Sequence, residues 1–118
     1  MGKNKIIIFA ILLSLFSISC AKGGLTETAS FSKIHKLPEV QSFIEKIGRV
    51  EGVRPVIRQE ESSAENANLF EYYVGESYPT HSVLWNRFAV DKKTSEVFVF
   101  DIESGDYISI EKWREKQK

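Results

Sequence analysis

An apolar stretch near the N-terminus constrains this chain most, because it separates an export segment from a smaller folding unit within the 118 residues. Residues 1–5 form a short basic segment, and residues 6–16 are apolar except for Ser14. This layout matches a signal peptide and is too short for a typical membrane span, which needs about 20 residues. Removing residues 1–19 would leave 99, which is enough for a single domain with a modest core.

The apolar stretch ends in Ser17-Ile18-Ser19-Cys20, with small or uncharged residues just before the cysteine. This motif resembles the lipobox of bacterial lipoproteins, although Ser17 stands where Leu is usual. The resemblance implies that a peptidase cuts before Cys20 and that its thiol carries a diacylglyceryl group. Cys20 is the only cysteine, so it cannot form an internal disulfide, and lipid attachment is its predicted role. The alternatives are an ordinary secretory signal and a short N-terminal membrane anchor.

The expected anchor leads to a prediction for localisation. Two acyl chains bind a membrane firmly, at about 0.8 kcal/mol per buried CH₂. Residues 21–30 are rich in Gly, Thr, Ala and Ser, which predicts a flexible tether between Cys20 and a domain over residues 31–118. Uncharged Ala21 resembles the signal for outer-membrane sorting, so we expect export to a bacterial membrane, and to the outer one where the cell has two.

Charge argues against a nucleic-acid partner. Lys and Arg together number 16, as do Asp and Glu. Lys3 and Lys5 fall in the signal, which leaves 14 basic against 16 acidic side chains in the mature part. Because the basic residues are scattered among glutamates, the chain lacks the positive field on which nucleic-acid binding relies.

Apolar periodicity predicts an α+β fold that starts with one amphipathic helix. Residues 38–48 place apolar side chains at positions i, i+3, i+4 and i+7, and Pro38 and Gly48 suit the two ends of a helix. The upstream residues Phe31, Ile34 and Leu37 are spaced by three, which fits either a short helical turn or a docked extended arm.

Four strands are expected after this helix, from alternating apolar positions. Pro55 places the first strand at a sheet edge, and the third is expected to direct Leu84 and Phe88 to one face. Ser109 suits the N-cap of a short terminal helix that lays Trp113 on the sheet. The predicted architecture is one helix on a four-stranded antiparallel meander with a short C-terminal helix, the strands covering residues 53–60, 69–76, 84–90 and 96–101.

The last predicted hairpin carries a second resemblance. Residues 88–101 read Phe-Ala-Val-Asp-Lys-Lys-Thr-Ser-Glu-Val-Phe-Val-Phe-Asp. This segment is similar to the end of PepSY-like domains, where Val-Asp-x-x-Thr-Gly-Glu-Val is usual, and it departs from them at Ser95, where Gly is expected. The resemblance implies a small extracytoplasmic binding or inhibitory module and supplies no catalytic residues.

Motifs for catalysis are missing from the sequence. It contains no Gly-rich phosphate loop, no Gly-x-Ser-x-Gly and no His-Glu-x-x-His, and its two histidines, His35 and His81, are far apart. Asp101, Glu103 and Asp106 lack the terminal Glu of a calcium loop and are interpreted as turn formers. We therefore predict a non-enzymatic protein without a metal or cofactor.

Residues 72–85 are the candidate binding segment, because they gather Tyr, Trp, His, Glu, Gly and Pro around one strand connection. Aromatic residues with polar tips on loops between strands are typical of recognition surfaces. The candidate binding residues are Glu76, Tyr78, His81 and Trp85, for an envelope protein or a cell-wall component. Inhibition of an envelope protease or lysozyme, and a small hydrolase, are the alternative functions.

A purely structural interpretation of the same segment stays open. In this interpretation Tyr72, Trp85 and Phe88 belong to the core or form cross-strand pairs, Gly75 marks a bulge and Pro79 shapes the turn.

Overall fold

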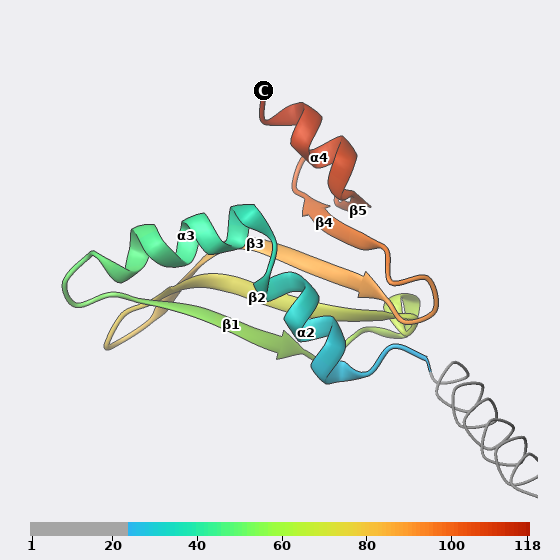
Figure 1. Cartoon of the computed structure of the whole chain (residues 1–118), viewed down its shortest axis with the longest axis horizontal. Coiled ribbons are helices and arrows are strands. Elements are labelled where there is room, and N and C mark those ends of the chain that lie inside the picture. Colours follow the sequence, from blue (N-terminus) through green and yellow to red (C-terminus); the bar gives the residue numbers. More distant parts are fainter. Residues whose placement is uncertain (1–23) are drawn as a thin grey trace, which may run out of the picture.

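The computed structural model describes residues 24–118, so the predicted signal peptide, Cys20 and residues 21–23 lie outside the described residues. Five strands form one sheet in the order β1-β2-β3-β4-β5, each antiparallel to the next (Figure 1). This confirms the α+β class and the antiparallel meander, and it corrects the strand count from four to five. The elements are α2 (Glu27–His35), α3 (Pro38–Gly48), β1 (Arg54–Glu60), η1 (Ala64–Asn66), β2 (Leu69–Ser77), β3 (Ser82–Asp91), β4 (Val97–Asp101), β5 (Asp106–Ser109) and α4 (Ile110–Lys116).

The additional strand is β5, which follows β4 through a tight turn at Gly105. The sequence placed Asp106 in that turn and Ser109 at the start of a helix, which left only Tyr107 and Ile108 between them. Two residues give no readable alternation, and pairing with β4 decides their structure. Ser109 does cap α4 as predicted, since its hydroxyl accepts a 3.2 Å hydrogen bond from the Lys112 amide.

Helix α2 begins inside the segment that was predicted to be a flexible tether. Thr26 caps this helix by accepting a hydrogen bond from the Ala29 amide, and Ser30 is fully buried. Leu25 packs against the core, and its amide donates to the Lys92 carbonyl at 3.3 Å. The tether prediction is therefore wrong for residues 25–30, because a polar cap and a buried hydroxyl, not apolar periodicity, fix this turn.

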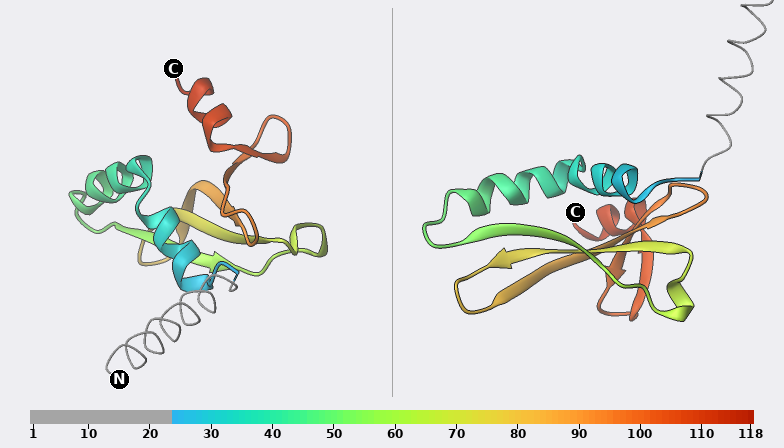
Figure 2. Two further views of the ribbon diagram at one scale, coloured as in Figure 1. Left: turned by 45° about the vertical axis from the view of Figure 1, so that its right-hand side comes forward. Right: turned by 90° about the horizontal axis from the view of Figure 1, so that it is seen from below.

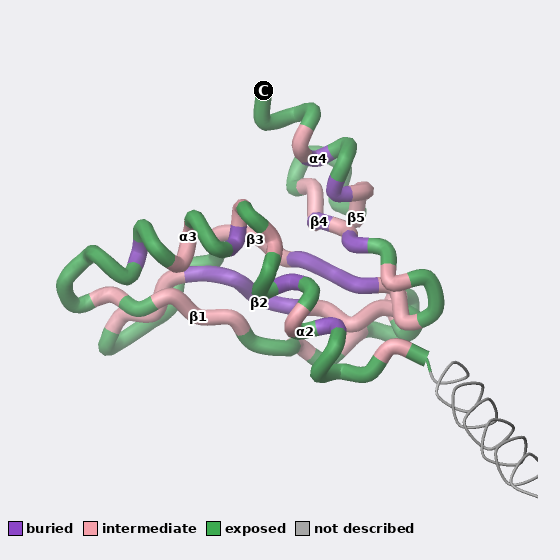
Figure 3. Tube along the Cα trace, viewed as in Figure 1, coloured by how far each residue is buried: buried purple, intermediate pink, exposed green. Residues whose placement is uncertain are grey.

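The α-helices pack on one face of the sheet. Figure 2 shows α2 and α3 one after the other along this helix face, and Ile34 of α2 and Val40 of α3 join the interior strand residues in one buried cluster (Figure 3). Trp113 of α4 meets Phe88 edge-on at 6.1 Å in the same cluster. Arg114 of α4 donates two hydrogen bonds, of 2.7 and 3.0 Å, to the carboxylate of Glu39 in α3, and they lower the pKa of that carboxyl. These hydrogen bonds connect the terminal helix α4 to α3.

We name the opposite face of the sheet the second face. The sheet curls around it, and side chains of neighbouring strands contact one another there. Arg87 of β3 reaches across β2 to Glu60 of β1, with a nitrogen–oxygen distance of 2.8 Å. The Arg58 guanidinium carbon lies 4.1 Å from the centre of the Tyr73 ring, and only 6% of Tyr73 is exposed. The contact of Arg87 with Glu60 across an intervening strand fits a strongly twisted sheet.

A bulge in β3 decides which side chains of that strand join the core. Val74 pairs with Asn86 but Gly75 pairs with Leu84, so Trp85 is the extra residue. Trp85 packs against the core and stacks on Phe43 of α3 at 4.4 Å, whereas Leu84 is 38% exposed. The expectation that Leu84 shares a face with Phe88 is wrong, because the bulge shifts the alternation by one residue.

Candidate functional site

The β2–β3 turn presents an ordered pair of polar aromatic rings. Tyr78 and His81 stack with their ring centres 4.8 Å apart and their planes 5° apart. The Tyr78 amide donates to the His81 carbonyl at 2.8 Å, and the Thr80 hydroxyl lies 3.0 Å from His81 Nδ1. Pro79, Thr80 and His81 are exposed. The turn therefore offers a rigid polar and aromatic tip to solvent.

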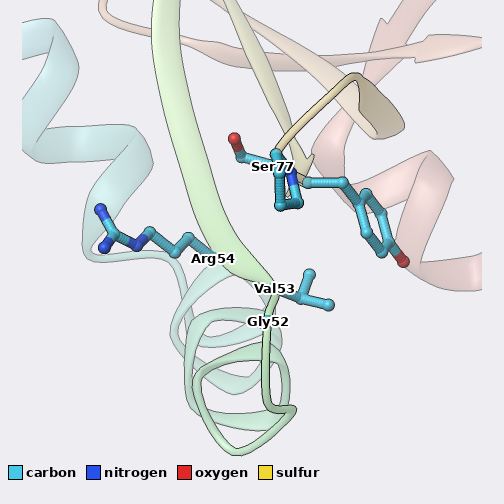
Figure 4. Close-up of a pocket in the computed structure, with 6 residues that line it drawn as sticks. Gly52, Val53, Arg54 and Ser77 are labelled. Carbon is cyan, nitrogen blue, oxygen red and sulfur yellow. The ribbon is translucent and has the colours of Figure 1, made fainter.

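An open cleft of about 470 Å³ lies beside this turn (Figure 4). It runs between the start of β1 and the end of β2, and Val53 and Arg54 point to opposite sides of the chain. Val50 and Val83 are 48% and 43% exposed near the same strand ends. We name this surface the hairpin end, and it comprises residues 50–54 and 76–84. Its lining of Gly52, Val53, Arg54, Ser77, Tyr78 and Pro79 combines apolar groups with a single cation.

The structure brings three of the four predicted binding residues to the hairpin end. Tyr78 and His81 form its tip, and Glu76 lies at its base, paired with Pro55 on one side and Val83 on the other. Trp85 is instead packed against the core, and the register shift lies at Gly75, as the structural interpretation of the segment expected. The candidate surface is therefore the turn and its flanks, without Trp85.

Two carboxylates outside the hairpin end, Asp91 and Asp101, serve local structure. Asp91 accepts hydrogen bonds from the Thr94 and Lys93 amides, which lower its pKa. Asp101 is held in the same way by Ser104 and Lys116, which lower its pKa. The position of Asp101 matches its interpretation as a turn former. His35 stacks on Phe31 within α2, on a different element from His81.

Residues 24–118 contain neither a metal-binding cluster of side chains nor a helix that could span a membrane. No cluster of three or more His, Cys, Asp or Glu side chains there is arranged to hold a metal ion. None of the helices in this range has the length and apolar character needed to cross a membrane.

Sequence reasoning missed the cleft residues Val53, Arg54 and Ser77, and the charged residues of the second face. The alternation in β1 could have predicted part of this charged face. Arg54, Arg58 and Glu60 are separated by four and two residues, so they share one face of the strand. Their partners on β2, β3 and β5 depend on the curl of the sheet, which no local pattern encodes.

Comparison with known proteins places no relative beside this chain: no protein-family model, no curated protein and no solved structure matches it. The resemblances to the lipobox and to PepSY-like domains stay predictions from the sequence motifs.

Proposed function

We propose that this chain is a lipid-anchored protein of the bacterial cell envelope, and that its domain binds an envelope protein or a cell-wall component at the hairpin end without catalysing a reaction. One observation carries the proposal. The hairpin end and Gly24, where the described chain begins, lie at opposite ends of the sheet (Figure 1).

The position of the anchor then orients the domain. Cys20 precedes Gly24 by four residues, and an extended chain advances at most about 3.5 Å per residue. The Gly24 end therefore stays within about 14 Å of a lipidated Cys20. Residues 25–30 belong to the folded domain. The distance between Cys20 and the domain is therefore shorter than it would be if the tether extended to residue 30. The hairpin end faces away from the membrane, where a partner is accessible.

The chemistry of the hairpin end suits a macromolecular partner. Tyr78 and His81 give planar contact area with polar groups at the rim, and their stacking limits the entropy lost on binding. Val50 and Val83 add exposed apolar surface, and Arg54 adds one positive charge. Aromatic residues and arginine are the types enriched where proteins bind each other.

The test is capture of envelope partners by crosslinking in intact cells. The full chain carrying Tyr78→Ala and His81→Ala should lose at least about tenfold in capture, as expected when interface residues worth more than about 1.4 kcal/mol are removed. Ile102→Ala with Glu103→Ala, in the exposed β4–β5 turn, is the matched control. An identical capture profile for both double variants would refute the hairpin end as the binding site.

The anchor is tested separately with Cys20→Ser. This change should abolish labelling by a fatty-acid analogue and leave uncleaved precursor. Retained lipid labelling would exclude Cys20 as the attachment point, whatever the hairpin end binds.

Inhibition of an envelope hydrolase is the second candidate function, and the rigidity of the turn favours it. The Tyr78–His81 stack and the hydrogen bond between their backbones hold Pro79 and Thr80 outward in one conformation, as a loop that enters an active-site cleft requires. Assays of protease and lysozyme activity with micromolar protein test this function. Undiminished hydrolysis in the whole panel would remove it.

A further inference from the structure

Strand β1 ends the sheet on one side and offers backbone groups that its own fold does not use. It pairs only with β2 among the strands of residues 24–118. Pro55 has no amide hydrogen, so its position in a paired strand is one whose backbone faces away from the neighbour. Alternate residues share this direction, which places the backbone groups of Ile57 and Gln59 on the free edge. In the right-hand view of Figure 2, β1 runs along the near side of the sheet.

An apolar hollow of about 260 Å³ lies next to this free edge. Pro55 and Ile57 form its floor, and α2 and α3 form its wall. The wall residue Phe31 remains 39% exposed. The hollow is lined by Phe31, His35, Ile44, Pro55 and Ile57. An added strand at the edge would cover it.

We propose that the occupant is a second copy of this chain, and that two β1 strands pair antiparallel about a two-fold axis at Ile57. In this register Ile57 faces Ile57 of the second copy, and each donates its amide hydrogen to the carbonyl oxygen of the other. Gln59 faces Pro55 of the second copy and donates to its carbonyl. The result is a ten-stranded sheet, with the two helix layers on the same side and the two apolar hollows facing each other across the axis.

The charges of β1 indicate that the partner is a second copy of this chain. Arg54 and Glu60 lie three residues on either side of Ile57, so each Arg54 faces Glu60 of the other copy and the dimer contains two such pairs. Both side chains belong to the second face, because β1 alternates and Glu60 contacts Arg87 there. Arg87 is bonded to Oε1 of Glu60, and Oε2 of that carboxylate is available to Arg54 of the second copy.

The neighbouring registers are disfavoured by the same residues. An axis at Val56 would set Arg54 against Arg58 of the second copy, which places like charges together twice. An axis at Arg58 would set two Arg58 side chains directly against each other. Among the axes at Val56, Ile57 and Arg58, only the one at Ile57 sets opposite charges against each other.

The test uses two variants of the full chain, purified in mild detergent and measured by sedimentation equilibrium at matched detergent density. Arg54→Glu alone and Glu60→Arg alone each place like charges together twice in the homodimer, so each should weaken dimerisation by about tenfold or more. Mixed in equal amounts, they restore both opposite-charge pairs between the copies and should form a heterodimer that is more stable than either variant homodimer. Glu45→Arg and Arg49→Glu, which exchange the same charges on α3, are the matched control and should show no gain on mixing.

A second measurement locates the contact. Ile57→Cys should form a disulfide between two copies under mild oxidation, because directly opposed residues in a hydrogen-bonded pair lie at about 5.5 Å between Cα atoms. The wild-type chain, with Cys20 alone, is the control. A wild-type chain that stays monomeric up to about 100 μM, well above dissociation constants typical of specific dimers, would overturn the proposal. So would a dimer in which mixing restores nothing and the Ile57→Cys chain crosslinks no more than the wild type.

Discussion

The hydroxyl of Tyr107 in β5 donates a 2.7 Å hydrogen bond to Glu71 in β2, although β3 and β4 lie between these strands in the sheet. A flat sheet would keep the two residues too far apart, since neighbouring strands are spaced by about 4.8 Å. The bond therefore reports the curl of the sheet around its second face. Burial, and then Glu71, raise the pKa of the Tyr107 hydroxyl well above its usual value.

Removal of this hydroxyl should loosen the last hairpin. Tyr107→Phe keeps the ring, which meets Phe100 edge-on at 5.5 Å, and leaves Glu71 without its donor. We expect the free energy of unfolding to fall by about 1 to 2 kcal/mol, measured by urea denaturation at neutral pH. An unchanged midpoint and slope would show that the contact adds nothing to stability.

The same residue makes stability depend on alkaline pH. An unfolded tyrosine ionises near pH 10, whereas Tyr107 keeps its proton to higher pH. Above about pH 10 the unfolded state then binds fewer protons than the folded state, so stability falls as pH rises through the folded pKa. Tyr72, whose pKa is also raised by burial, contributes in the same direction. Tyr107→Phe should therefore reduce the slope between pH 10 and 11, and equal slopes in both chains would contradict this assignment.

Prediction from the sequence succeeded where a pattern is local. The spacing of apolar residues in α3, the Pro38 start and the Ser109 cap each depend on neighbours within one turn, and each is found in the structure. Glu76, Tyr78 and His81 were named as candidates from a local signal as well, a strand connection that contains Gly75 and Pro79; the structure gathers them at the hairpin end, and their role in binding stays a prediction.

Features that depend on distant partners were missed. Strand β5 is defined by β4, and the start of the domain depends on a contact between Ser30 and Tyr72, which are 42 residues apart. The bulge at Trp85 reversed the expected direction of Leu84, since an alternating pattern cannot show one inserted residue. The cleft beside Tyr78 needs the start of β1 and the end of β2 together.

Ser30 should be essential for docking the N-terminal segment. Its buried hydroxyl bonds to the Tyr72 hydroxyl and donates to the Glu27 carbonyl at 2.9 Å. Ser30→Ala leaves the Tyr72 hydroxyl with only a long hydrogen bond of 3.3 Å to the Glu27 carbonyl. We therefore expect the free energy of unfolding, measured by thermal denaturation, to fall by about 1 to 2 kcal/mol. Thr28→Ala, at an exposed position of the same helix, should change stability by less than about 0.5 kcal/mol. Equal effects of the two changes would argue for a mobile segment.

Ser95 should accept glycine with a gain in stability. Its φ of 64° is in the left-handed region, which favours glycine, and it lies in the β3–β4 turn at the position where the PepSY-like motif has Gly. Ser95→Gly keeps the carbonyl that accepts a 2.5 Å bond from Lys33, and it should add about 0.5 to 1 kcal/mol to the free energy of unfolding. Ser104→Gly, in the β4–β5 turn without a positive φ, should have the opposite sign. Destabilisation by both changes would show that no strain resides at Ser95.

Gly75 should be the least replaceable glycine of the described chain, because the bulge brings the β3 backbone against it. A methyl group at this position would overlap the Val83 carbonyl oxygen and lie 2.9 Å from a ring carbon of Tyr73. Gly75→Ala must therefore displace the strand that supports the Tyr78–His81 turn, and we expect a loss of about 2 to 3 kcal/mol or more. Gly48→Ala, where nothing lies within 4 Å of the added carbon, should leave stability unchanged or raise it by up to about 1 kcal/mol. Urea denaturation of both variants separates the effects, and a Gly75→Ala chain as stable as Gly48→Ala would mean that β3 adapts its register freely.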